Sequence, residues 1–214
     1  MRRAWLVLAC AAAFAAEPEY VKLPSGLEMH KTEVTVDQFR AFVEATGHQT
    51  VAEKAQAERT WRNPGFPVVG LQPVVYVNYR DAEAYCRWKG ARLPTEGEWE
   101  YANRAGAATT HSWGEGLDER YVWYRENSDG APKPVGTKAA NPWGLHDMEG
   151  NVWEWTTGER YVFRGGSWMS CPKISPWATE GAPLLRVPVV TKQDMADDDL
   201  GFRCVRAGVA GAKP

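Results

Sequence analysis

The feature that most constrains the fold is the uneven distribution of helix signals along the chain. Three N-terminal capping patterns, beginning at Thr35, Asn78 and Thr95, each precede an apolar helical face. A glycine closes each helix, at positions 47, 90 and 106. Residues 107–204 are short apolar pieces separated by Gly, Pro, Asn and Asp, and carry no further strong helix signal. The chain is therefore predicted to be an α+β protein with helices early and a loop-rich second half.

Two segments between the helices are predicted to be extended or irregular. Residues 73–77 are apolar and β-branched, which predicts a short strand, and residues 51–70 predict a long loop. Eleven tryptophans, 20 glycines and 14 prolines favour a loop-rich domain held by bulky aromatic anchors. The formal net charge is only −2 and no basic block is present, so nucleic acid is not an expected partner.

The N-terminus has the pattern of a secretory signal peptide. Arg2 and Arg3 precede an apolar run, and Ala13-Phe14-Ala15 offers a small-x-small cleavage site. We expect residues 1–15 to be a signal peptide, 16–206 one domain and 207–214 a flexible tail. The run is too short for an ordinary transmembrane helix, and no other segment could span a membrane. A periplasmic or secreted protein is expected.

The expected export determines whether the cysteines can form disulfides. Cys10 lies inside the leader, and a lipoprotein anchored through it is the alternative to cleavage. Beyond the leader the chain keeps Cys86, Cys171 and Cys204. In an oxidising compartment an odd count predicts one disulfide and one spare thiol, without saying which cysteines pair.

Several motifs, taken in order, resemble the formylglycine-generating-enzyme, or sulfatase-modifying-factor, family. The motifs are Glu33-Val-Thr35, Arg92-Leu-Pro-Thr-Glu96, Asn141-Pro-Trp-Gly-Leu145, Asp147-Met-Glu-Gly-Asn-Val-Trp-Glu-Trp155, Arg164-Gly-Gly-Ser-Trp168 and Gly201-Phe-Arg-Cys204. The resemblance covers most of residues 30–206. It implies a C-type-lectin-like fold with two helices beside a small twisted sheet. It also implies a disulfide between Cys86 and Cys204, the alternative being two buried free thiols.

The glycine turn at residues 147–154 is a candidate metal site. Oxygen-only ligands in a compact loop suit Ca²⁺. The resemblance implies structural calcium held by the side chains of Asp147 and Glu154 and the carbonyls of Gly150 and Val152. The alternative is a turn in which the carboxylates cap backbone N–H groups. A second calcium is not expected, although Asn127 and Asp129 are candidates for one.

The expected active-site region departs from the family's oxidases. Those enzymes place two cysteines after the Arg-Gly-Gly-Ser stretch, and paired thiolates suit copper(I). Here Ser170 and Ser175 occupy the two positions, and Cys171 lies one residue late. A protonated hydroxyl does not replace a thiolate, so Cu(I) is not an expected cofactor. Ser167 matches a serine near the family's active site.

Smaller departures accompany the missing cysteines. Asp199 stands where family oxidases often carry asparagine, and Asn103 and Glu180 stand where a second disulfide would be. We expect a monomeric, divergent oxidase-type or accessory maturation protein that acts on an exported protein or peptide. Whether it is an enzyme stays open. The alternative is a lectin-like module that binds peptide or glycan without catalysis.

Overall fold

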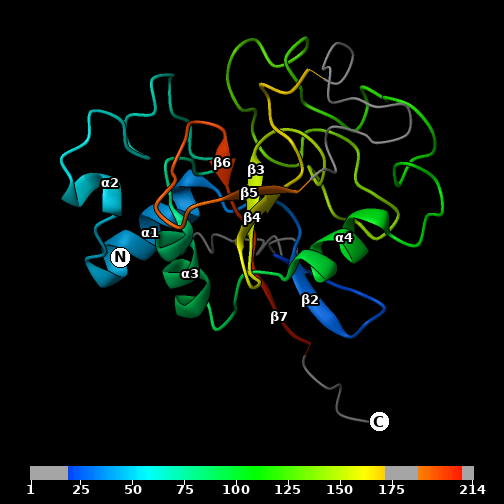
Figure 1. Cartoon of the computed structure of the whole chain (residues 1–214), viewed down its shortest axis with the longest axis horizontal. Coiled ribbons are helices and arrows are strands. Elements are labelled where there is room, and N and C mark those ends of the chain that lie inside the picture. Colours follow the sequence, from blue (N-terminus) through cyan, green and yellow to red (C-terminus); the bar gives the residue numbers. More distant parts are fainter. Residues whose placement is uncertain (1–18, 172–187, 209–214) are drawn as a thin grey trace, which may run out of the picture.

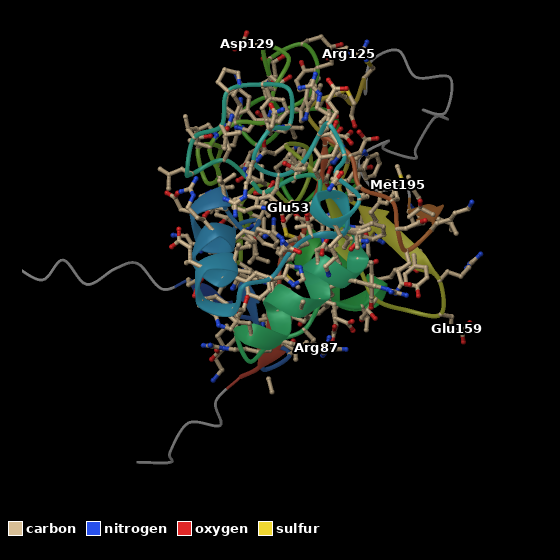
Figure 2. The ribbon with its side chains drawn as sticks, turned by 90° about the vertical axis from the view of Figure 1, so that its left-hand side faces the viewer. Glu53, Arg87, Arg125, Asp129, Glu159 and Met195 are labelled. Atoms are coloured by element: carbon tan, nitrogen blue, oxygen red, sulfur yellow. A yellow bond between two sulfur atoms is a disulfide. The ribbon has the colours of Figure 1, made fainter. Side chains whose placement is uncertain are left out.

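A computed structural model describes residues 19–171 and 188–208. Three of its helices match the predicted ones: α1 (Val36–Thr46), α3 (Tyr79–Trp88) and α4 (Glu96–Arg104), each opened by a complete capping box. One short helix, α2 (Val51–Lys54), lies in the segment predicted to be a loop. The side chain of Thr50 accepts from the Glu53 N–H there and opens α2 in the same way. Figure 2 shows α1 and α3 lying side by side.

The strands form two small sheets. The first, in the order β1 (Tyr20–Lys22), β2 (Leu27–His30), β7 (Val205–Ala207), is antiparallel and joins the two ends of the described chain. The second has the order β5, β4, β3, β6, and only its β3–β6 pair is parallel. Its strands are β5 (Val189–Thr191), β4 (Tyr161–Arg164), β3 (Trp153–Thr156) and β6 (Leu200–Gly201). In Figure 1, α1 and α3 lie on one side of these strands and α4 on the other.

The predicted strand at residues 73–77 is absent. Thr35 and Pro73 form only an isolated bridge, and Tyr76 has a φ of 54°, which interrupts an extended backbone. The Tyr76 N–H donates instead to the carbonyl of Asp197 at 2.9 Å. This segment therefore serves as a buried connection that also contacts the acidic stretch before β6.

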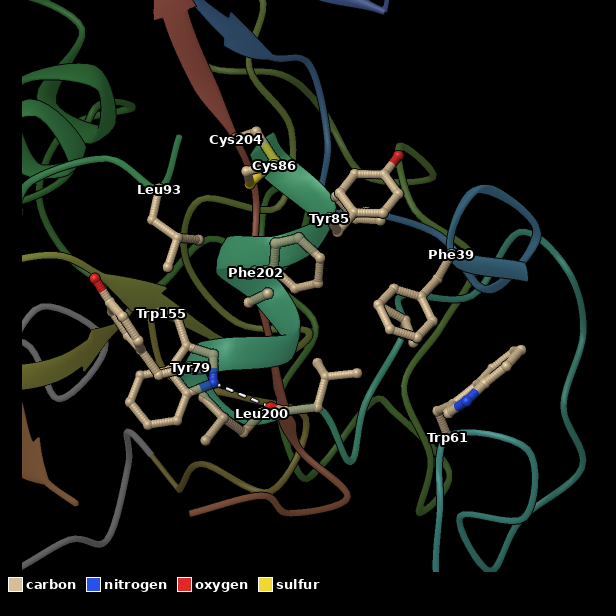
Figure 3. Packing of buried hydrophobic residues seen from close by; sticks show 14 of the residues in the cluster. Phe39, Trp61, Tyr79, Tyr85, Cys86, Leu93, Trp155, Leu200, Phe202 and Cys204 are labelled. Atoms are coloured by element: carbon tan, nitrogen blue, oxygen red, sulfur yellow. Dashed lines mark hydrogen bonds between the residues drawn. A yellow bond between two sulfur atoms is a disulfide. The ribbon is translucent and has the colours of Figure 1, made fainter. Parts of the chain in front are cut away.

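Aromatic side chains fill the core, as the composition predicted. Trp61, Trp99 and Trp155 are fully buried, and the rings of Tyr85 and Phe202 meet edge to face at 5.4 Å (Figure 3). Such contacts add to the stabilisation from apolar burial. The core therefore joins helices, loops and both sheets, and needs no long regular elements.

The Cys86–Cys204 disulfide is present and links α3 to the segment just before β7 (Figure 3). Within the residues described, no helix is both long and apolar enough to cross a bilayer. The predicted signal peptide lies outside the described residues, as does the predicted tail beyond Gly208.

Candidate functional site

The loop that follows β4 carries the predicted active-site residues. Gly165 has a φ of +106°, and a Cβ there would lie 3.1 Å from the Met148 carbonyl oxygen, so the loop requires glycine at this point. Ser167 comes two residues later and is only 1% exposed. Its hydroxyl donates to Asp199 Oδ2 at 2.6 Å. The loop and Asp199, the residue just before β6, thus form one site.

Asp199 has an unusual environment for a carboxylate. Burial raises its pKa to about 6, and the hydrogen bond from Ser167 opposes that rise. Asp197 and Asp198 raise it further, and the three carboxylates lie within 4.8 Å of one another. The structure places this acidic stretch against the Ser167 loop.

Aromatic and backbone contacts hold the acidic stretch to that loop. Trp168 Nε1 donates to the Asp198 carbonyl at 3.3 Å, and the Trp168 ring meets Phe66 edge to face. The proximity could not be inferred from the sequence, because about 30 residues separate the partners. The one sequence feature that marked this site was Asp199, which stands where family oxidases often carry asparagine.

Ser170 and Cys171 complete the described part of the loop. Ser170 Oγ accepts from the Ser167 backbone N–H at 2.9 Å, so this hydroxyl closes a local turn. Cys171 is half-buried, and within the described residues it is the one cysteine outside the disulfide. Ser175 lies outside the described residues. Ser167, Ser170 and Asp199 therefore offer oxygen atoms at this site, and the thiol of Cys171 offers sulfur.

The predicted calcium turn contains one unsatisfied carboxylate oxygen. Asp147 is 3% exposed; its Oδ2 accepts from the Gly136 N–H at 2.6 Å, and its Oδ1 has no partner among the described residues. Gly150 has a φ of +89°, and a Cβ there would lie 2.3 Å from the Trp123 carbonyl oxygen. Glycine at 150 is therefore required by close backbone packing, whether or not a metal binds.

Glu154 has a different environment. Arg203 donates to both of its oxygens at 2.7 Å, and Trp99 Nε1 donates to Oε2 at 2.9 Å. Glu154 and Arg203 are both 0% exposed. Val152, the other predicted contributor, is also fully buried two residues earlier. A buried pair of this geometry stabilises only while both partners remain.

Glu33 is a site residue that sequence reasoning missed. It is 0% exposed; Oε1 accepts from Asn151 Nδ2 at 3.1 Å, and Oε2 has no partner among the described residues. Burial, then the Asp147 charge, raise the Glu33 pKa well above its ordinary value. Glu33 opens a recognised motif, but nothing in the sequence places it beside Asn151, 118 residues away.

The buried carboxylates fit a hard cation. When ionised, the carboxylates of Glu33, Asp147 and Glu154 carry three negative charges, and the nearby Arg203 carries one positive charge, so these four buried side chains sum to −2. Two carboxylate oxygens lack donors, and oxygen ligands of this kind are those that Ca²⁺ prefers. The donor set therefore fits the ion that the family resemblance implied.

The candidates for a second ion are already engaged. Asn127 accepts from the Tyr124 N–H at 2.9 Å and donates to the Val122 carbonyl at 3.0 Å. Asp129 forms an ion pair with Lys133 at 2.8 Å. Within the described residues these two side chains therefore serve the loop itself.

Comparisons with known proteins agree with the motifs. A family model described as the sulfatase-modifying factor enzyme 1-like domain matches residues 10–208. The chain is 38% identical over 180 residues to the formylglycine-generating enzyme of Mycobacterium tuberculosis, covering 65% of this chain and 58% of that protein. It is 36% identical over 186 residues to the inactive C-alpha-formylglycine-generating enzyme 2 of Bos taurus, covering 72% and 58%. It thus spans less than two thirds of either relative.

A solved structure supports the fold. PvdO from Pseudomonas aeruginosa superposes with a TM-score of 0.67 at 24% identity, covering 85% of this chain and 80% of that one. The predicted α+β, C-type-lectin-like fold with little regular structure is thereby confirmed. Ordered motifs, fold and family model agree, and the chain belongs to the sulfatase-modifying-factor family of formylglycine-generating-enzyme-like proteins.

Proposed function

We propose that this chain is a divergent, exported member of its family that acts on or matures an exported protein or peptide without copper-based formylglycine chemistry. The observation that carries the proposal is the chemistry of the loop after β4. Ser170 stands at the first position of the copper pair and uses its hydroxyl to accept from the Ser167 N–H. A neutral hydroxyl is a poor ligand for a soft monovalent metal.

The arrangement around Asp199 supports a role for the site other than copper binding. A buried carboxylate with a raised pKa beside a serine hydroxyl can accept a proton or bind a donor group of a ligand. One relative is named a formylglycine-generating enzyme and another its inactive counterpart, so the same fold accompanies both descriptions. Membership of the family therefore does not decide whether this chain is catalytic.

The proposed function also includes export of the chain and a structural calcium ion. The Cys86–Cys204 disulfide supports an oxidising compartment, in agreement with the leader-like N-terminus. The unsatisfied oxygen of Asp147 supports a structural calcium in the turn beside β3. When bound, the ion would brace this turn, which contacts the active-site loop through the Gly150 N–H and the Gly165 carbonyl at 2.8 Å.

The direct test is a peptide assay. The purified chain is incubated with Cu(I), O₂ and a sulfatase-motif peptide, Cys-x-Pro-x-Arg, and the peptide cysteine is followed by mass spectrometry. We expect no conversion to formylglycine, because the paired thiolates are missing. Conversion with turnover, abolished by Cys171→Ser, would contradict the proposal.

A second candidate function is binding without catalysis. Phe66 contacts Trp168. Val69 and Leu71, which follow Phe66 in the chain, are 51% and 63% exposed and give this segment apolar surface. A partner captured without turnover and with unchanged affinity for Cys171→Ser would favour this alternative over the enzymatic one.

A further inference from the structure

Three buried side-chain atoms near β1, β2 and α3 have no hydrogen-bond partner among the described residues: Tyr20 Oη, His30 Nε2 and Tyr85 Oη. His30 is 2% exposed and Tyr85 is 0% exposed. A polar atom that is shielded from water and bonds to nothing costs free energy, and native proteins contain few of them. These three atoms therefore call for a ligand, provided that they lie close to one another.

The strand register and the ring contacts bring the three side chains together. Tyr20 and His30 lie directly opposite each other in the β1–β2 pair, and their ring centroids are 4.3 Å apart. The His30 and Tyr85 rings meet edge to face, with centroids 6.5 Å apart. The Tyr85 hydroxyl points away from Phe39 and Phe202, so it is not part of their apolar packing (Figure 3). The N-terminal hairpin and α3 thus meet at this cluster.

Glu19 adds a carboxylate at the edge of the same cluster. Its Oε1 lies 3.8 Å from His30 Nε2, which is too long for a direct hydrogen bond. Polar groups at this separation are often bridged by a water molecule. Gln38 Nε2 donates to Glu19 Oε1 at 3.0 Å, and Lys89 Nζ pairs with Oε2 at 3.0 Å, so the carboxylate is held in position. The Glu19 side chain is 34% exposed and marks the solvent side of the cluster.

The charges around the cluster favour a neutral ligand. Burial raises the pKa of Tyr20 to about 12, and burial followed by the Lys89 charge lowers the pKa of His30 to about 3. The phenol and the imidazole are therefore uncharged at neutral pH. The Glu19 carboxylate repels an anion, while the Lys89 ammonium and the Arg203 guanidinium repel a cation. A small neutral molecule that both donates and accepts hydrogen bonds meets these conditions.

We infer that one structural water molecule binds here, accepting from the Tyr20 and Tyr85 hydroxyls and donating to His30 Nε2 and Glu19 Oε1. Buried waters typically make about three hydrogen bonds to groups that otherwise have no partner. His30 then carries its own proton on Nδ1.

This water fastens the β1–β2 hairpin to α3 beside the disulfide. Tyr85 directly precedes Cys86, and the His30 backbone N–H donates to the Cys204 carbonyl at 2.9 Å. The bound water therefore connects the two segments that the Cys86–Cys204 bond also joins. The inference lies outside the proposed function and depends on neither calcium nor copper.

Phenylalanine substitutions in the full chain test the inference by the sign of their effect. Removing a hydroxyl that bonds to a water lowers stability, whereas removing a buried hydroxyl that bonds to nothing is neutral or stabilising. We expect Tyr85→Phe and Tyr20→Phe each to lower the folding equilibrium constant by about three- to tenfold in urea unfolding at pH 7.5. Tyr101→Phe is the matched control, since Tyr101 is 41% exposed, and it should change the constant by less than about twofold.

Nuclear magnetic resonance observes the water itself. In the wild-type chain we expect a nuclear Overhauser effect from a long-lived water to the His30 ring, and ¹⁵N shifts that place the imidazole proton on Nδ1. The Overhauser effect should weaken in Tyr85→Phe. A Tyr85→Phe variant at least as stable as wild type, a wild-type chain without the long-lived water, or a proton on His30 Nε2 would each overturn the inference.

Discussion

At the scale of single residues, Asp199 offers the clearest pH-dependent signature. Its folded-state pKa of about 6 lies above the ordinary value of 3.8. A carboxyl whose pKa is raised by folding stabilises the folded state at pH values below its ordinary pKa. This stabilisation is lost as the pH rises through about 6. At neutral pH the wild-type chain therefore carries a buried carboxylate at a cost in stability.

Asp199→Asn is expected to stabilise the protein at pH 7.5 by roughly 1–3 kcal/mol, because asparagine is neutral and still accepts from Ser167. The difference should shrink as pH falls toward 4. Urea unfolding at several pH values measures it, and the exposed Asp194→Asn is the matched control. A variant less stable than wild type at pH 7.5 would contradict this account of the site.

Residue-level prediction from sequence succeeded where the residues are close in the chain. Ser167, Ser170 and Cys171 were expected in one loop, and they share one. Glu33 was missed, because its contact with Asn151 spans 118 residues and only tertiary structure creates it. The pairing of Glu154 with Arg203 was missed for the same reason, with 49 residues between them.

At the scale of elements, the helices were predictable because their signals are local. A side chain at the N-cap and another three residues later satisfy the first backbone N–H groups, so α1, α3 and α4 can be located from short patterns. The pattern at Thr50 follows the same rule, and α2 was missed because the surrounding segment is polar and rich in Pro and Gly.

Sheet topology was not predictable from those patterns. The strands are only two to four residues long, too short for alternation to be read with assurance. The first sheet pairs β2 with β7 from the opposite end of the described chain, and the second pairs β3 in parallel with β6. Such long-range pairings depend on the packed core, and only the family resemblance anticipated the architecture.

At the scale of the whole molecule, the Cys86–Cys204 disulfide spans 118 residues. Replacing both cysteines with alanine is expected to lower stability by roughly 3–5 kcal/mol, since the unfolded chain regains the entropy of a large closed loop. Denaturant unfolding of the oxidised proteins measures the loss. Cys171→Ser is the control and should leave stability nearly unchanged, because its thiol makes only a weak 3.8 Å contact with the Met169 carbonyl. Equal stability of the double variant and wild type would contradict a structural role for the bridge.

The most direct test of the central claim is a competitive Cu(I) titration against a chromophoric chelator. The wild-type chain is compared with a Ser170→Cys, Cys171→Ser, Ser175→Cys variant that restores the family's cysteine spacing. We predict that the variant binds about one equivalent of Cu(I) tightly and that the wild type does not compete, because paired sulfur is what the soft ion requires. Stoichiometric, tight Cu(I) binding by the wild-type chain would contradict the account.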